Sequence, residues 1–153
     1  MELHFLGTGA ANPSPTRGAS SVVLRNPSGS CWMFDCGEGT QIQLMKSNIR
    51  PGKLDKIFIT HLHGDHLFGL PGLLCTISMN CAEDRGPINI YGPKGLGQYV
   101  ETCLRLSGAQ LKFSYTVHEL CEKGMLDTVG EGSVHLFVHG ELITGYAPLP
   151  SNP

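Results

Sequence analysis

Short runs of apolar residues, each bounded by Gly, Pro or Ser, recur along residues 1–120. Such punctuated runs are typical of strands, and the last of them also alternates apolar and polar residues with a period of two. The pattern predicts strands at residues 3–6, 21–24, 31–34, 56–60, 88–91 and 111–117.

Three stretches between these runs have helical spacing instead. Residues 39–47 place Ile42 and Met45 three apart, and an apolar stripe begins at Leu96. Residues 66–79 are apolar on several sides, which predicts a buried helix. Strands therefore come first and then alternate with helices, which indicates an α/β fold with a mixed β-sheet and flanking helices.

The pattern weakens from about Cys121 onward, where glycines interrupt the apolar runs. Residues 134–138 and 141–146 are the two short stretches that fit strands there. The chain thus divides into a well-patterned part, residues 1–120, and a poorly patterned remainder, residues 121–153.

Composition narrows the class of protein. The 153 residues carry 11 Lys and Arg against 13 Asp and Glu, a net charge of −2, which excludes a basic nucleic-acid-binding tail. With 41% hydrophobic and 16% charged residues, the chain is expected to form one globular domain. No run reaches the ~18 apolar residues of a membrane span, and no apolar segment with a basic flank opens the sequence. We therefore expect no membrane association and an intracellular location, in the cytoplasm or the nucleus.

The six cysteines would be able to pair in an oxidising compartment. None of them forms a Cys-x-x-Cys pair, and a chain of this length has a core of its own. Reduced thiols with structural roles are therefore expected.

The candidate chemistry lies in the segment 61–66, His-Leu-His-Gly-Asp-His, which follows a predicted strand. In an extended loop, residues two apart point to the same side, so His61 and His63 are placed to share one metal ion. The glycine permits a sharp reversal, after which Asp65 and His66 face a second position. Such ligands suit two zinc ions about 3.5–4 Å apart, a geometry that hydrolyses phosphodiesters. The alternative is a chance cluster of solvated histidines or helix caps.

This segment resembles the signature of the metallo-β-lactamase superfamily, and the motifs around it are similar to those of the tRNase Z family in its short form. The matching segments stand in the family's order and cover roughly residues 3 to 120: residues 5–11, 13–20, 34–41, 59–66, 69–74 and 90–96. The resemblance implies a four-layer αβ/βα sandwich of two similar halves. Residues 1–120 would form the N-terminal half of this metallo-β-lactamase-type domain, and residues 121–153 match poorly, so the domain is truncated.

The same resemblance implies an activity and a site. Members of the family are zinc-dependent endoribonucleases that remove the 3′ trailer from precursor tRNA. On the matching positions, His61 and His63 would bind one zinc ion and Asp65 and His66 the other, with Asp65 also accepting a proton from the attacking water. His139, six residues before a Gly-aromatic pair, would be a third ligand of the first ion. Full-length members add a second half with further ligands and a tRNA-gripping arm, and a homodimer is expected of them.

Two residues outside the segment have candidate roles. Asp35 closes the strand predicted at 31–34, where a buried acid needs partners. It would either orient a ligand imidazole through the nitrogen that does not bind metal, or cap the helix that begins near Gly37. Arg17, in the loop 12–20, is placed to meet a phosphate near the scissile bond.

Three functions stay open at this level. The first is a zinc phosphodiesterase of tRNA 3′ processing, of which an isolated half has little activity. The second is another hydrolase of the metallo-β-lactamase fold, against which the motifs at 34–41 and 91–93 argue. The third is a truncated product that binds zinc or a partner without catalysis, as the missing second half indicates.

Overall fold

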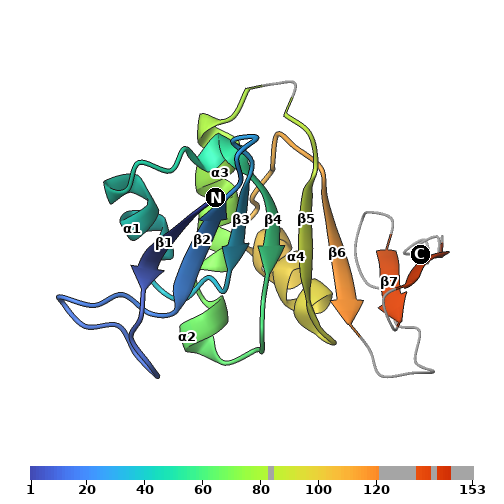
Figure 1. Cartoon of the computed structure of the whole chain (residues 1–153). Coiled ribbons are helices and arrows are strands. Elements are labelled where there is room, and N and C mark those ends of the chain that lie inside the picture. Colours follow the sequence, from blue (N-terminus) through green and yellow to red (C-terminus); the bar gives the residue numbers. More distant parts are fainter. Residues whose placement is uncertain (83–84, 121–133, 139–140, 146–153) are drawn as a thin grey trace.

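The computed structural model describes residues 1–82 and 85–120, and the backbone of residues 134–138 and 141–145 (Figure 1). The strands of the main sheet are β1 (Glu2–Gly7), β2 (Ser21–Arg25), β3 (Cys31–Phe34), β4 (Leu54–Phe58), β5 (Ile88–Pro93) and β6 (Tyr115–Leu120). The helices are α1 (Thr40–Lys46), α2 (Gly64–Leu67), α3 (Leu70–Asn80) and α4 (Leu96–Leu106), and a 3-10 turn, η1, spans Pro51–Lys53. None of the helices in these ranges has the length and apolar character needed to cross a bilayer.

The six strands form one mixed sheet in the order of the chain, β1-β2-β3-β4-β5-β6. The first three strands pair antiparallel, and β3 to β6 pair parallel. Helices α3 and α4 lie behind the sheet in Figure 1, and α1 packs beside α3 and β1. The predicted α/β architecture, with strands first and then strands alternating with helices, is confirmed.

The covered face of the sheet forms the core. Met33, Ile57 and Ile90 occupy neighbouring parallel strands, and none of their surface is exposed. They pack with the buried leucines of α3 and α4, in one cluster with Leu74 and Leu96. Each of these side chains contributes ~1.5–3 kcal/mol by leaving water.

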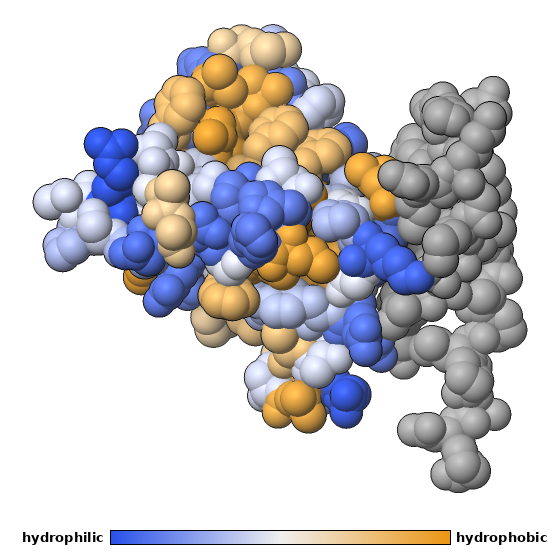
Figure 2. Space-filling view, turned by 90° about the horizontal axis from the view of Figure 1, so that it is seen from below, coloured by the Kyte–Doolittle hydropathy of each residue, from blue (hydrophilic) through white to orange (hydrophobic). Residues whose placement is uncertain are grey.

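The opposite face of the sheet carries a row of aromatic rings from β3 to β6. Phe34 stacks on Phe58 with centroids 5.0 Å apart, Phe58 on Tyr91 at 4.9 Å, and Tyr91 on His118 at 4.4 Å. Phe5, on β1, is 67% exposed. Figure 2 looks along the strands from below, and apolar residues gather at its upper side, which is the front of the sheet in Figure 1. No helix of the described residues covers this apolar face, which is the face that the expected second half would cover.

The helix predicted at 66–79 is divided into α2 and α3. The helix is interrupted at Gly69, whose amide donates to the carbonyl oxygen of Cys36 over 2.9 Å. A Cβ on Gly69 would lie 2.2 Å from the carbonyl oxygen of Gly37, so the two segments meet backbone to backbone. The apolar pattern continues across this break, and the sequence therefore did not reveal it.

The strand predicted at 111–117 is wrong in its first half, because β6 begins only at Tyr115. The amide of Lys112 instead donates to the hydroxyl oxygen of Ser78 on α3 over 2.8 Å. Phe113 is 7% exposed and belongs to the core. A loop held on a helix thus produces the same alternation as a strand. The two late strands are present as β7 (Val134–Val138) and β8 (Glu141–Gly145), paired antiparallel.

Gly37→Ala is expected to destabilise the chain by about 1–3 kcal/mol, the usual cost of overpacking. A Cβ there would lie 2.1 Å from the carbonyl oxygen of Asp65 and 2.6 Å from the Cβ of Ala19. Urea unfolding followed by circular dichroism measures the change. Gly52→Ala is the matched control, because no atom lies within 4 Å of its added Cβ. Equal midpoints for both variants would contradict the close approach.

Candidate metal centre

The candidate site lies at the carboxyl ends of β3 and β4. These strands are parallel neighbours, so the residues that follow them meet at one edge of the sheet. The amide of Asp35 still donates to the carbonyl oxygen of Phe58, over 2.8 Å, and the amide of Cys36 donates to the carbonyl oxygen of His66, also over 2.8 Å. The segment 61–66 is thereby held against the end of β3.

Asp35 is the most buried charged group of the site, with 6% of its surface exposed. Its Oδ1 accepts from the amide of Thr60 at 2.8 Å and from the Thr60 hydroxyl at 2.9 Å. Its Oδ2 lies 2.7 Å from Nδ1 of His66. An ionised carboxylate only accepts, so Nδ1 carries the proton and Nε2 of His66 is left for another partner.

The alternative prediction, that Asp35 caps a helix, is wrong, because Asp35 makes no capping hydrogen bond to α1. The N-cap of α1 is Gly39, and no side chain caps this helix. Asp35 also has a φ of 58°, in the left-handed region that costs a non-glycine residue of order 1–3 kcal/mol. The contacts with Thr60 and His66 are what hold it there.

Thr60 was not singled out from the sequence, although it links two imidazoles to Asp35. Its hydroxyl proton goes to Asp35, and its oxygen lies 3.0 Å from Nδ1 of His61. Nδ1 of His61 is therefore the donor of that contact, which leaves Nε2 of His61 free in the same way as Nε2 of His66. A threonine directly before a His-x-His segment is the signal that was available for this role.

The four predicted ligand side chains lie together. The ring centroids of His61 and His66 are 4.0 Å apart, and those of His61 and His63 are 4.7 Å apart. Nε2 of His66 lies 3.4 Å from Oδ2 of Asp65. They form one cluster, and the division of these ligands between two ions stays a prediction. Within residues 1–82 and 85–120, no group of three or more His, Cys, Asp or Glu side chains has the arrangement of a metal site.

Asp65 is tied to the N-terminal loop. Its Oδ2 accepts from the amide of Ala11 over 2.7 Å, and 11% of its side chain is exposed. The Ala11 amide, followed by the charges of His66 and His63, holds the pKa of the Asp65 carboxyl below its usual value. Ala11 has a φ of 66°.

Arg17 lies in the same loop as Ala11 and is exposed. Its Nη1 donates to the Thr8 hydroxyl over 2.7 Å, and the amide of Gly9 donates to the carbonyl oxygen of Gly18 over 2.8 Å. These contacts close the loop on itself beside Asp65. His139, the remaining candidate ligand, lies outside the described residues.

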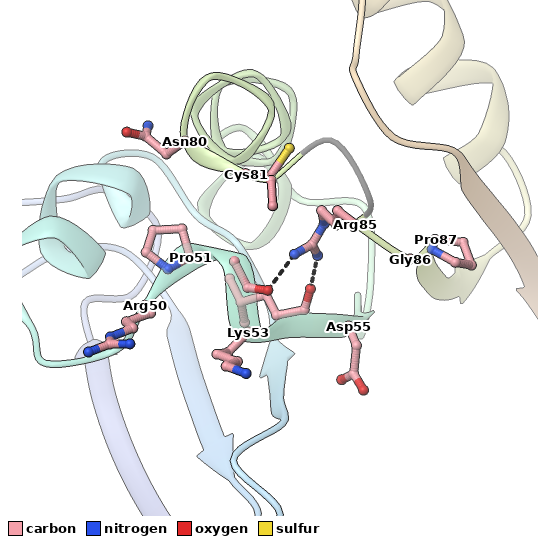
Figure 3. A pocket seen from close by; sticks show the side chains of 12 residues that line it. Arg50, Pro51, Lys53, Asp55, Asn80, Cys81, Arg85, Gly86 and Pro87 are labelled. Atoms are coloured by element: carbon pink, nitrogen blue, oxygen red, sulfur yellow. Dashed lines mark hydrogen bonds between the residues drawn. The ribbon is translucent and has the colours of Figure 1, made fainter.

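A cavity of about 580 Å³, drawn in Figure 3, is lined by none of the residues of this cluster. It is lined by η1, the start of β4 and the residues before β5. Arg85 points into it and donates to the carbonyl oxygens of Gly52, over 2.6 Å, and Leu54. Since the guanidinium is used to hold the turn of η1, the cavity adds no group to the candidate metal centre.

None of the five cysteines in the described part of the chain, Cys31, Cys36, Cys75, Cys81 and Cys103, is in a disulfide. Cys36 is fully buried next to the segment 61–66, and burial raises the pKa of its thiol to about 12. We expect iodoacetamide at pH 8 to label Cys75 and Cys103, which are partly exposed, and to spare Cys36 until the chain is unfolded. Peptide mass spectrometry gives the extent at each position. Labelling of native Cys36 at the rate of Cys75 would contradict this burial.

The chain is similar to proteins of known name. A family profile described as "Anti-Pycsar protein Apyc1" matches residues 1–137. The zinc phosphodiesterase ELAC protein 1 of Mus musculus is 63% identical over 122 residues, which are 78% of this chain and 33% of that protein. The crystal structure of the short form of human tRNase Z (ELAC1) superimposes with a TM-score of 0.76 and 55% identity, covering 89% of this chain and 51% of that one.

A more distant structure agrees in fold. The metallo-β-lactamase fold protein YhfI from Bacillus subtilis gives a TM-score of 0.57 at 16% identity, over 75% of this chain and 45% of that one. The sheet and its flanking helices are therefore those of a metallo-β-lactamase fold. The chain spans about a third of the mouse relative's length and about half of the human chain.

Proposed function

The chain belongs to the family described as Anti-Pycsar protein Apyc1 and is a homologue of tRNase Z with the metallo-β-lactamase fold, and we propose that it forms the N-terminal half of a zinc-dependent phosphodiesterase that removes 3′ trailers from precursor tRNA. One observation carries the proposal. Asp35 contacts Nδ1 of His66 and Thr60 contacts Nδ1 of His61, which leaves the Nε2 atom of each ring for a metal ion; Nε2 of His66 lies 3.4 Å from Oδ2 of Asp65. This is how metal-binding histidines are prepared.

The donor set fits zinc. Imidazole nitrogens and a carboxylate are ligands that zinc prefers, and His61, His63 and His66 with Asp65 supply four of them. We assign His61 and His63 to one ion and Asp65 and His66 to a second. Because the described residues contain no complete three-ligand arrangement, further ligands come from His139 and from a C-terminal half.

Bound zinc would supply a Lewis acid and lower the pKa of a water molecule towards ~7. The chain's own groups do the rest. Asp35 keeps His66 in one tautomer and orientation, and Asp65 accepts the proton of the attacking water. Arg17, on the loop beside Asp65, meets a phosphate oxygen near the scissile bond.

The grip on tRNA comes from outside this chain. A net charge of −2 gives no broad attraction for phosphate, and the aromatic row lies on the sheet face that the second half is expected to cover. The apolar sheet face supports a second half packed against residues 1–120. We further propose a homodimer of the complete protein.

Two other functions are separable from this one. A different hydrolase of the same fold would bind zinc but spare tRNA, and the name of the family profile mentions no RNA. A truncated product without catalysis would retain zinc and lack turnover. Identity of 63% to a zinc phosphodiesterase over 122 residues favours the nuclease.

The test compares this chain with an extended protein, in which the C-terminal half of the mouse relative follows residue 120. We expect the chain alone to self-associate and cleave little, and the extended protein to release the 3′ trailer and leave a 3′-hydroxyl. The extension should raise the affinity for folded precursor tRNA far more than the affinity for an unstructured RNA with the same 3′ end. Equal gains would make the protein a general single-strand nuclease, and zinc binding without RNA cleavage would favour the alternatives.

A further inference from the structure

We propose that the main-chain N–H of Ala11 is a positioning group for Asp65, so that the loop 8–20 is part of the metal centre; this rests on the proposed function. Asp65 and Ala11 are 54 residues apart in the chain, and Oδ2 of Asp65 accepts from the amide over 2.7 Å. The donor is a main-chain N–H, which every residue except proline has, so the residue type at position 11 does not indicate the contact.

The contact extends the row of groups that holds His66. Oδ2 of Asp35 lies 2.7 Å from Nδ1 of His66, and Nε2 of the same ring lies 3.4 Å from Oδ2 of Asp65. The Asp65 oxygen that faces the imidazole is the one that accepts from Ala11. His66 is thus held from β3 on one side, and Asp65 is held from the N-terminal loop on the other. Without Ala11, the Asp65 carboxylate would be free to rotate towards solvent.

The loop is built to present this amide. Ala11 is in the left-handed region, with a φ of 66°, at a cost of about 1–2 kcal/mol for a residue with a Cβ. The turn is closed by the amide of Asn12 on the carbonyl oxygen of Ala10, over 2.8 Å, and by the Gly9 and Arg17 contacts. Strained residues cluster at functional sites, and the amide that Ala11 presents reaches only Asp65 among the described residues.

The experiment replaces single amides by esters, using lactic acid at position 11 in the 153-residue chain. This change removes the N–H and keeps the side chain. The control is the hydroxy-acid analogue of serine at position 14, where the lost amide donates to the carbonyl oxygen of Arg17 over 2.8 Å and lies in the same loop. Each ester removes one main-chain N–H of the same loop together with the hydrogen bond that it donates, and thermal unfolding compares the stability of the two chains.

Cobalt(II) is the probe, because its visible absorption reports ligand geometry as well as affinity. The ester at position 11 is expected to bind cobalt roughly 10–100-fold more weakly and to change the visible band, as for other groups that orient a metal ligand. The ester at position 14 should bind within about twofold of the unaltered chain. The Ala11→Gly variant, which keeps the N–H, should have the cobalt affinity and the visible band of the unaltered chain.

Equal weakening by both esters, or none at position 11, would overturn the proposal, and so would a chain that binds no cobalt at all. RNA cleavage is measured separately on the extended protein. A cobalt difference with no cleavage of precursor tRNA would contradict the proposed function and leave the role of Ala11 supported.

Discussion

His66→Ala is expected to weaken zinc binding by about 100-fold or more and to remove most of the phosphodiesterase activity of the extended protein. In the described part of the chain, His66 is the side chain that touches both carboxylates, through Nδ1 to Asp35 at 2.7 Å and Nε2 towards Asp65 at 3.4 Å. Loss of an outer partner alone costs ~10–100-fold in metal affinity, so loss of a ligand costs at least as much.

The variant also leaves Asp35 buried without its imidazole partner, which lowers stability. Zinc titration and cleavage of precursor tRNA are therefore measured together with thermal unfolding. His4→Ala is the matched control, because His4 lies on β1 and, within the described residues, its ring has one hydrogen-bond partner, Glu2 at 3.2 Å. Unchanged zinc stoichiometry in His66→Ala would contradict the assignment of this ligand.

Asp35→Ala and Asp35→Asn are expected to separate folding from metal binding. The alanine variant leaves the amide and hydroxyl of Thr60 and Nδ1 of His66 without an acceptor, each at a cost of about 1–3 kcal/mol. Asparagine retains one acceptor oxygen for Thr60 and tolerates a positive φ better than alanine. The asparagine variant should therefore recover most of the stability.

Zinc affinity should not recover with it. Either the NH2 group or the carbonyl oxygen of the asparagine side chain must face His66. Because both are neutral, the side chain no longer orients the imidazole and raises its basicity as the carboxylate does. We expect zinc binding roughly 10–100-fold weaker than that of the unaltered chain in both variants. Urea unfolding and zinc titration give the two quantities independently. An asparagine variant with unaltered zinc affinity would show that Asp35 acts only as a structural acceptor.

The positions of the strands and of the histidine segment were predictable because their signals are local. Met33, Ile57 and Ile90 lie in short apolar runs bounded by Gly, Pro or Ser, and such runs are typical of strands. The spacing of His61, His63 and His66 likewise follows from the two-residue repeat of an extended loop and the turn after it. The family resemblance in turn depends on short motifs that stand in a fixed order along the chain.

The amino-acid pattern alone therefore predicts the α/β class, the mixed sheet and the side chains gathered at one edge. Tertiary contacts set four further features: the interruption of the helix at Gly69, the late start of β6, the choice of partner by Asp35 and the contact of Ala11 with Asp65. Each of these depends on groups far apart in the chain, such as a glycine backbone against another backbone or an amide on a carboxylate. A backbone donor is present at almost every position, so its identity carries no signal until the fold brings it within hydrogen-bonding distance of one acceptor.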